Sequence, residues 1–130
     1  MPTPKELVLA YVDAFNNGDL DGLCSLFAPD AQIWGVTGFA TPDKARFIWQ
    51  QLMSSLRINL QIDSIVEDGN TVAVRYTERG RSLAPFLGHE PTGKSYELLA
   101  MEFFEIDGGQ IQRRWGARDS ASQNRQLGFS

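Results

Sequence analysis

The apolar residues of this chain change their spacing near residue 57, and that change limits the possible folds more than any other sequence feature. Before it, they recur every three or four residues, which is the spacing of one face of an α-helix. After it, they alternate with polar residues, which is typical of a half-buried β-strand. Helices followed by consecutive strands predict an α+β fold, in which a curved antiparallel sheet packs against the N-terminal helices and forms a cone. The mouth of such a cone can hold a pocket.

Three helices are predicted in the first part of the chain. Thr3 and Glu6 have the spacing of a capping box, which marks the start of the first helix. Asp19 is the predicted N-cap of a second, shorter helix, and a short strand is expected at residues 31–35. The third helix begins at Thr41-Pro42 and has the clearest pattern in the chain. Its apolar face is predicted to comprise Ala45, Ile48, Trp49, Leu52, Met53 and Leu56.

The second part of the chain has the pattern of strands joined by turns. Apolar and polar residues alternate from residue 58 onward, and Asp68-Gly69-Asn70 has the composition of a tight turn. A loop rich in glycine and proline, residues 80–93, separates this hairpin from the rest of the chain. Three more elements are predicted: a long strand at residues 94–106, a last strand at residues 110–119 and a short helix at residues 120–127.

The charge balance and the scarcity of cysteine and histidine exclude several classes of protein. Sixteen acidic residues outnumber twelve Lys and Arg, so binding to nucleic acid, which depends on neutralising phosphates, is not expected. Cys24 is the only cysteine and His89 the only histidine, so neither an internal disulfide nor a metal site is expected. No apolar run approaches the ~18 residues of a membrane span, and the N-terminus lacks the apolar region of a secretory signal. We therefore expect one cytoplasmic domain over residues 1–130, with no membrane partner.

Two carboxylates on the predicted inward face of the sheet are candidates for catalysis. Alternation along the last strand places Trp115, Ala117 and Asp119 on one side, which we expect to face inward. Asp119 is then a candidate acid/base or, alternatively, a cap of the final helix. Glu102 lies in the middle of the inward face of the preceding strand, where an unpaired charge would be costly. Pairing with an arginine, or exposure to solvent, is the alternative to a catalytic role for Glu102.

Aromatic residues and the single histidine are candidates for the walls of a small-molecule pocket. Trp34, Trp49, Trp115 and Tyr76 are predicted to shape it, with membership of the core as the alternative. His89 is a further candidate for ligand contact, with a solvated loop imidazole as the alternative.

The other face of the long strand is also apolar, which predicts a sheet that is covered on both sides. Leu99, Met101 and Phe103 share this face, and Glu97 and Glu105 border it. Helices are predicted to cover one side of the sheet, and a second copy of the chain, in a homodimer, the other.

Four short stretches carry a family resemblance: residues 16–23 (Asn-Asn-Gly-Asp-Leu-Asp-Gly-Leu), 91–94 (Pro-Thr-Gly-Lys), 114–119 (Arg-Trp-Gly-Ala-Arg-Asp) and 126–128 (Gln-Leu-Gly). Together with the order of the elements, they resemble the SnoaL-like polyketide cyclases of the nuclear transport factor 2-like superfamily. This resemblance implies a cystatin-like α+β cone that is commonly dimeric through the outer face of its sheet. It also implies a cofactor-free site inside the cone for a small apolar or aromatic, polyketide-like ligand.

The resemblance also suggests roles for individual residues. In these cyclases an aspartate near the end of the last strand is the general acid/base of an intramolecular aldol condensation, and Asp119 matches that position. A histidine on the preceding strand assists, and Glu102 occupies about that place here. The family's last strand often has a histidine before its tryptophan and an aspartate after it, where this chain has Arg114 and Gly116.

Three functions follow as alternatives. The first is a polyketide cyclase or isomerase that uses Asp119 and Glu102 for cofactor-free acid/base chemistry. The second is a hydrolase resembling limonene epoxide hydrolase, which needs an Asp-Arg-Asp arrangement, although Arg75 has the wrong strand parity beside Tyr76. The third is a non-catalytic ligand-binding or accessory protein. The direction of the Asp119 side chain distinguishes them, because a catalytic carboxylate faces the cavity and a helix cap does not.

Overall fold

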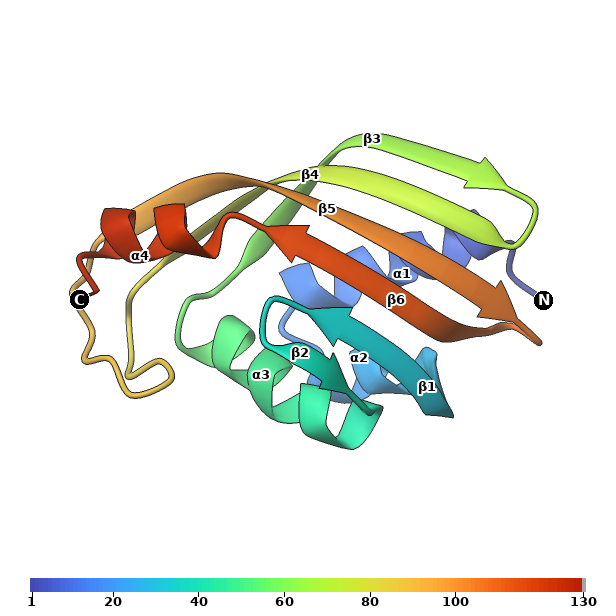
Figure 1. Ribbon diagram of the computed structural model, residues 1–130, viewed down its shortest axis with the longest axis horizontal. Helices are drawn as coiled ribbons and strands as arrows, with labels where there is room; N and C mark the ends of the chain where they lie inside the picture. The colour runs from blue at the N-terminus through green and yellow to red at the C-terminus, as the bar shows by residue number, and fades with distance from the viewer. Residues whose placement is uncertain (130) are drawn as a thin grey trace.

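Six strands form one sheet in the computed structural model, which describes residues 1–129. Their order across the sheet is β2-β1-β6-β5-β4-β3 (Figure 1). Along the chain, the elements are α1 (Pro4–Asn16), α2 (Leu20–Ser25), β1 (Phe27–Gly35), β2 (Gly38–Ala40), α3 (Pro42–Ser54), β3 (Asn59–Asp68), β4 (Thr71–Arg81), β5 (Ser95–Asp107), β6 (Gln110–Arg118) and α4 (Ser120–Leu127).

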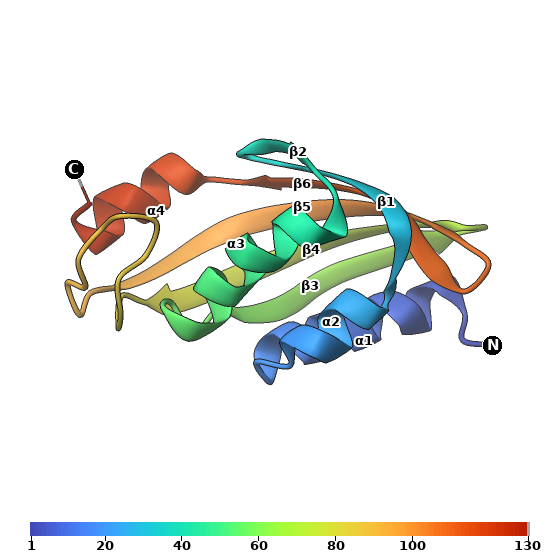
Figure 2. The same cartoon turned by 90° about the horizontal axis from the view of Figure 1, so that it is seen from below.

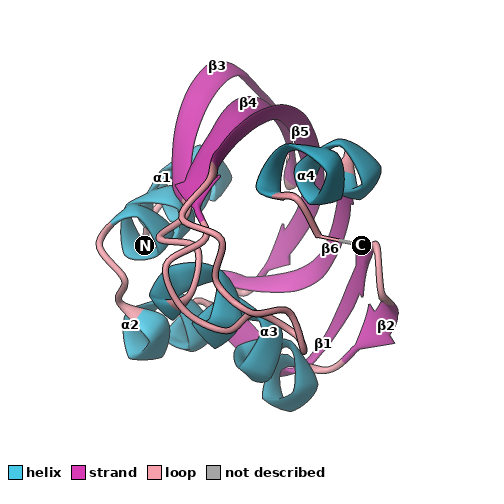
Figure 3. Cartoon of the chain, turned by 90° about the vertical axis from the view of Figure 1, so that its left-hand side faces the viewer, coloured by secondary structure: helices cyan, strands magenta, loops and turns pink. Residues whose placement is uncertain are grey.

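The sheet curves around the helices without closing on itself. Figure 3 shows it as an arc with α1, α2 and α3 on its concave side, and Figure 1 shows α4 beyond the end of β6. Figure 2 shows α1 and α2 side by side, and α3 lies across the same face of the sheet. The predicted α+β architecture, a curved sheet packed against N-terminal helices, is confirmed.

The pairing of β1 with β6 differs from the all-antiparallel sheet that we predicted. Strands β3 to β6 are joined as consecutive antiparallel neighbours, whereas β1 runs parallel to β6. A short turn between two consecutive strands forces them to be antiparallel. No such turn joins β1 to β6, which lie at opposite ends of the chain, so the spacing of apolar residues carried no information on their relative direction.

Side-chain caps define α1 and α2 as predicted, whereas Thr41 precedes α3 without a side-chain cap hydrogen bond and the start of β1 differs. Thr3 and Glu6 form the capping box of α1, and the Asp19 carboxylate accepts a hydrogen bond from the Gly22 amide at the start of α2. Strand β1 begins at Phe27 rather than residue 31 and contains Pro29, which lies where the β1–β6 register shifts. A proline, which has no amide hydrogen to donate, is tolerated there because the regular hydrogen-bond ladder is interrupted. In the described part of the chain, no helix has the length and apolar character required to cross a membrane.

A bulge near the start of β6 reverses the predicted faces of that strand. Ile106 of β5 opposes Ile111, but the neighbouring Glu105 opposes Arg113, so β6 has one residue more than β5 at this point. An extra residue moves every later side chain to the opposite face, because strand side chains alternate with a period of two. The predicted inward orientation of Trp115 and Ala117 is therefore wrong. The side chains of β6 that face the helices beyond the bulge are Arg114 and Arg118, with Gly116 between them.

The core lies between α1 and the concave face of the sheet. Tyr11 is buried, and its ring makes edge-to-face contacts with Phe15, Phe27 and Phe104 at centroid distances of 5.1, 6.0 and 5.0 Å. Such contacts stabilise aromatic clusters beyond the burial of apolar area. Because Tyr11 is anchored by its ring, its hydroxyl group has a fixed position at the inner edge of the core.

Candidate functional site

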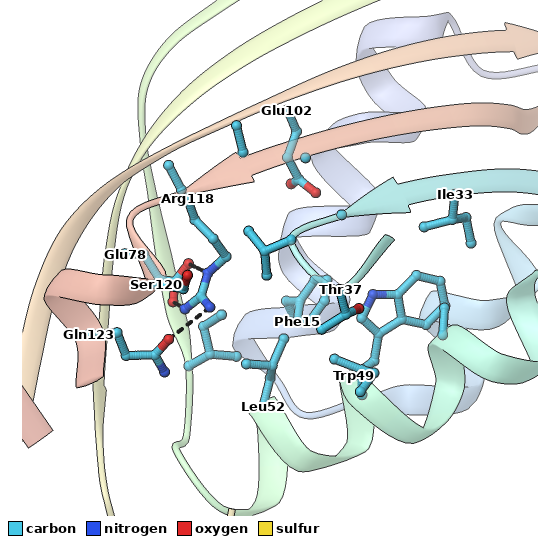
Figure 4. Close-up of a pocket in the computed structure, with 18 of the residues that line it drawn as sticks. Phe15, Ile33, Thr37, Trp49, Leu52, Glu78, Glu102, Arg118, Ser120 and Gln123 are labelled. Atoms are coloured by element: carbon cyan, nitrogen blue, oxygen red, sulfur yellow. Dashed lines mark hydrogen bonds and ion pairs between the residues drawn. The ribbon is translucent and has the colours of Figure 1, made fainter. Parts of the chain in front are cut away.

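A cavity of about 340 Å³ lies between the concave face of the sheet and helices α1, α3 and α4. Figure 4 shows its apolar wall on one side and a group of charged and polar side chains on the other. Cavities of this size accommodate small organic molecules. Most of the wall is apolar and includes Phe15, Ile33, Ile48, Trp49, Leu52, Ile58 and Leu60.

Glu102 projects from β5 into this cavity and belongs to a first tyrosine–glutamate–arginine cluster, Tyr11, Glu102 and Arg114. The Tyr11 hydroxyl donates to Glu102 Oε2 at 2.8 Å, and Arg114 Nη1 donates to the same oxygen at 2.6 Å. The side chains of Glu102 and Arg114 are 10% and 13% exposed. Both bonds end on Oε2, and no described residue donates a hydrogen bond to the second carboxylate oxygen, Oε1.

Gly116 allows Arg114 to reach Glu102. It opposes Glu102 across the β5–β6 pair, and the Arg114 side chain, two residues earlier on β6, passes over it. A Cβ atom at position 116 would lie 2.6 Å from Arg114 Nη1, which is closer than two such atoms can approach. A larger residue at this position would therefore force the end of the Arg114 side chain to shift from its place beside Glu102.

The two tyrosines of the cavity remain protonated. Burial, followed by the negative charge of Glu102, raises the pKa of Tyr11 well above its ordinary value. The same two causes, in the same order, raise the pKa of Tyr76, whose buried hydroxyl has no hydrogen-bond partner among the described residues. Burial alone would lower the pKa of Arg114, but the nearby Tyr11 and Glu102 raise it overall. The site therefore combines a carboxylate with neutral hydroxyl groups and a permanent cation.

A second tyrosine–glutamate–arginine cluster, Tyr96, Glu78 and Arg118, lies toward α4. Tyr96 donates to Glu78 Oε2 at 2.5 Å, Arg118 Nε donates to Oε1 at 3.0 Å, and Arg118 Nη2 donates to Oε2. The Glu78 side chain is 2% exposed. Arg118 Nη1 also donates to Gln123 Oε1 at 2.8 Å, which ties the cluster to α4 (Figure 4). Both oxygens of Glu78 are thus engaged by protein donors.

The charges that line the cavity cancel in pairs. Glu102 is paired with Arg114, and Glu78 with Arg118. Over residues 1–129, no three His, Cys, Asp or Glu side chains are gathered as metal ligands would be. An uncharged ligand fits a cavity of this kind. A charged ligand would be buried without a counterion, because each charged group of the cavity is already paired with another protein group.

The structure brings together four of the residues predicted for the site. Glu102, Tyr76, Trp49 and His89 all line the cavity, and the ring of His89 stacks on Phe129 with the centroids 4.3 Å apart. Pairing of Glu102 with an arginine, one of the alternatives from the sequence, is confirmed.

Trp34, Trp115 and Asp119 do not line the cavity. Trp34 and Trp115 stack on each other on the outer face of the sheet, with ring centroids 5.2 Å apart. Trp34 follows the inward Ile33, and Trp115 is turned outward by the bulge in β6. Asp119 is exposed and is the N-cap of α4, where its Oδ1 accepts a hydrogen bond from the Ser122 amide at 2.9 Å. The predicted inward orientation of Asp119 is wrong.

Comparison with known protein families identifies the chain. The sequence pattern of the SnoaL-like domain matches residues 8–114, which is most of the sequence. The chain belongs to the SnoaL-like family. The matched part includes Tyr11, Glu78, Glu102 and Arg114, whereas Asp119 follows it.

Solved structures agree with this assignment. IdmH, a candidate polyketide cyclase from Streptomyces antibioticus, is 27% identical, with a TM-score of 0.83 over 98% of this chain and 99% of IdmH. A candidate polyketide cyclase from Pseudomonas putida KT2440 is 26% identical, with a TM-score of 0.82 over 98% and 99% of the two chains. AclR, a candidate hydroxylase from Streptomyces galilaeus, has a TM-score of 0.88 at 22% identity over 98% and 96%, and shares the fold. The SnoaL-like fold thus extends over nearly the whole chain.

Eight polar residues of this SnoaL-like cavity were absent from the sequence-based site: Tyr11, Thr37, Glu78, Arg114, Arg118, Ser120, Gln123 and Asn124. Glu78 shares the parity of Tyr76 on β4, so the alternation already placed it on the inner face. The two arginines were assigned to the outer face because the bulge in β6 was not foreseen. Tyr11 has the spacing of the buried face of α1, and helical spacing carries no information on where its hydroxyl group points.

Proposed function

We propose that the chain is a polyketide cyclase-like or isomerase-like enzyme that performs cofactor-free proton transfer next to a carbonyl group, with Glu102 as its acid/base. The observation that supports this proposal is a carboxylate inside an apolar cavity with one oxygen held by Tyr11 and Arg114. A positioned carboxylate is a common general base for carbon acids. The ligand is a small apolar or aromatic, polyketide-like ketone.

The proposed first step is removal of a proton from the carbon next to the carbonyl by Glu102. The electron pair of the broken C–H bond forms the enolate double bond, and the carbonyl oxygen takes the negative charge. The hydroxyl of Tyr76 and the guanidinium of Arg114 are the donors beside Glu102 that would stabilise this oxygen. In an isomerase, Glu102 returns the proton to another carbon. In a cyclase, the enolate carbon bonds to a second carbonyl of the same molecule, and Glu102 gives its proton to the new alkoxide.

Two carboxylates compete for the role of base, and a pair of amide substitutions separates them. We would measure deuterium exchange from solvent into a panel of β-dicarbonyl compounds, aromatic polyketide analogues included, by proton NMR. Glu102→Gln should reduce the enzymatic exchange rate by about 10²–10⁴-fold, the usual contribution of a general acid/base. Asp119→Asn should retain the rate, because asparagine caps a helix as well as aspartate does. Loss of exchange in Asp119→Asn alone would instead identify Asp119 as the base.

A non-catalytic ligand-binding protein is the second candidate. It is favoured by the exposed Asp119, whose carboxylate caps α4 instead of facing the cavity, and by the ion pair that already engages Glu102 with Arg114. Saturable binding of the diketones with exchange no faster than in buffer would establish this alternative. A hydrolase is less well supported, because Arg75 is half-exposed and forms its ion pair with Asp63 on the side of β4 opposite Tyr76.

We further propose that two copies of the chain associate through the outer face of the sheet. Large apolar side chains are exposed there on strands β2, β3 and β5, namely Phe39, Val66, Leu99, Met101 and Phe103. Stable interfaces bury about 1,200–2,000 Å² in total and exclude charge from their centre. Phe103→Lys should therefore convert a dimer to a monomer in sedimentation velocity experiments. Phe47→Lys, at a still more exposed position on α3, is the control and should leave the dimer intact. A monomeric unmodified protein would contradict the proposal.

A further inference from the structure

Helix α4 presents polar side chains to a cavity whose other walls are mostly apolar. Ser120, Gln123 and Asn124 all line the cavity. Their spacing of three and four residues places them on one face of the helix. Figure 4 shows Ser120 and Gln123 beside Arg118 and away from Trp49. This end of the cavity therefore offers hydrogen-bonding groups that the proposed proton transfer at Glu102 does not use.

The hydrogen bond from Arg118 fixes the orientation of the Gln123 amide. Gln123 is 2% exposed, and its Oε1 accepts from Arg118 Nη1 at 2.8 Å. A guanidinium has donors only, so the amide oxygen must face Arg118 and the amide nitrogen must point away from it. Among the described residues, Gln123 Nε2 has no hydrogen-bond partner. A buried donor without an acceptor is unfavourable, and a bound ligand can supply the acceptor.

The two polar ends of the cavity are separated by a length that suits an elongated ligand. Glu78, which binds Arg118, opposes Leu98, and Leu98 precedes Glu102 by four residues on β5. Four residues of a strand span about 13 Å. Between these ends the inner face of β5 contributes only Ala100, which leaves room for a flat molecule.

We propose that the α4 end of the cavity is a second polar subsite, in which Gln123 Nε2 donates a hydrogen bond to an oxygen at the far end of the ligand. This inference rests on the proposed function, because it places the reacting carbonyl of the same ligand at Glu102. It defines the ligand class as an uncharged, elongated and largely apolar molecule with an oxygen acceptor at each end. Because the charges that line the cavity are already paired with one another, neither end of the ligand needs to be charged.

Two nearly isosteric probes test the subsite. The first is 2,6-diacetylnaphthalene, which has a ketone at both ends, and the second is 2-acetyl-6-isopropenylnaphthalene, in which one ketone oxygen is replaced by a methylene group. Dissociation constants would be measured from the quenching of tryptophan fluorescence, since Trp49 lines the cavity. The wild-type protein should bind the diketone about tenfold more tightly, which is the effect of one hydrogen bond to a buried donor.

Variants of Gln123 identify the donor. Gln123→Glu retains an oxygen for Arg118 but replaces the amide donor by an acceptor, so the tenfold preference should disappear or reverse. Gln123→Leu should abolish the preference while the isopropenyl probe still binds, and circular dichroism would confirm that both variants fold. Equal affinities of the wild-type protein for the two probes, or a preference that survives in both variants, would overturn the proposal. So would the absence of saturable binding of either probe.

Failure of the subsite and failure of the proposed function are distinguishable in the same preparation. Binding of the probes does not require turnover, whereas deuterium exchange into their acetyl groups does. A preference that depends on Gln123 without accelerated exchange supports the subsite and contradicts catalysis by Glu102. Accelerated exchange that depends on Glu102, with no effect of Gln123 on either probe, supports catalysis and contradicts the subsite.

Discussion

The cavity contains two clusters of the same composition, and they differ in how completely the glutamate is engaged. In the first cluster, Glu102 accepts two hydrogen bonds, both on Oε2, and is 10% exposed. In the second, Glu78 accepts three hydrogen bonds on both oxygens and is 2% exposed. A carboxylate with a free oxygen can act on a ligand, whereas one whose oxygens are all engaged can only hold its neighbours in place. Residue type alone therefore does not distinguish the two glutamates, whereas the number of unused lone pairs on each carboxylate does.

The largest expected effect is on catalysis and concerns Glu102 alone. If the free oxygen of Glu102 is the one that removes the proton, Glu102→Gln lowers the deuterium exchange rate by about 10²–10⁴-fold, because the amide cannot take up a proton. The exchange rate of Glu78→Gln, measured at a temperature where it is fully folded, should remain within about tenfold of wild type. An equal loss of exchange in both variants would remove the distinction between the clusters.

The order reverses for stability, where Glu78 should have the larger effect. Glu78→Gln leaves the buried guanidinium of Arg118 without its counterion, and removal of one partner of such a pair costs about 3–5 kcal/mol. Urea denaturation followed by circular dichroism measures the loss. The matched control is Glu97→Gln, which breaks an exposed pair with Arg79 and should cost less than about 1 kcal/mol. A similar cost for Glu78→Gln and Glu97→Gln would contradict a structural role for the second cluster.

The tyrosines of the two clusters predict how stability depends on pH. The chain has three tyrosines, and burial, together with the neighbouring glutamates, raises the pKa of each of them, Tyr11, Tyr76 and Tyr96. The folded protein thus retains three protons that the unfolded chain loses above about pH 10. Stability should be unaffected by these groups below that pH and should fall above it by about 1.4 kcal/mol per pH unit for each tyrosine. The absorbance of tyrosinate should appear only as the protein unfolds; its appearance near pH 10 in the folded state would contradict this.

A smaller effect is expected from crowding of the first cluster. Gly116→Ala places a Cβ atom against Arg114 Nη1 and should cost about 1–3 kcal/mol of unfolding free energy. If the contact with Arg114 is the cause, the same substitution should cost almost nothing in an Arg114→Ala background. A double-mutant cycle measured by thermal denaturation gives this coupling energy. Additive effects of the two substitutions would show that Gly116 has another role.

The smallest effect concerns Asp119, which belongs to neither cluster. Asp119→Ala removes the N-cap of α4 and should cost about 1 kcal/mol, whereas Asp119→Asn should preserve stability. Thermal denaturation of the two variants tests the cap, and their exchange rates should both equal that of the wild type. If the exchange rate of Asp119→Ala fell by a larger factor than its fraction of folded protein, Asp119 would again be a candidate catalytic group.

Local signals in the sequence predicted the helices and the period of the strands, because the forces that set them act between near neighbours. Thr3, Glu6 and Asp19 identified two helix starts, and alternation placed Glu102 and Tyr76 on the inner face. The Glu102–Arg114 pair depends on the register between two strands, which one extra residue in β6 determines. Such a register reflects the packing of the whole sheet and leaves no short-range pattern.

The parallel pairing of β1 with β6 was not predictable for a similar reason, because it too depends on long-range packing. Strand β1 is separated from β6 by most of the chain, and only the completed curve of the sheet brings Ile33 beside Arg114. The outward positions of Trp34 and Trp115 follow from the same register. Thus the two tryptophans predicted for the pocket support each other on the outside, while Trp49, placed by a purely helical spacing, lines the cavity as expected.

The bulge in β6 also affects how knowledge can be transferred between relatives of this chain. An alignment matches residues by their order, whereas the side of the sheet that a residue faces depends on whether its number after the bulge is odd or even. Two homologues that differ by one residue at Ile111–Gln112 would align tryptophan with tryptophan and yet present opposite sides of the strand to the ligand. Catalytic assignments beyond that point are therefore transferable only between chains that share the bulge. The insertion or deletion of one residue there exchanges the cavity-facing and the outward-facing sides of a whole strand.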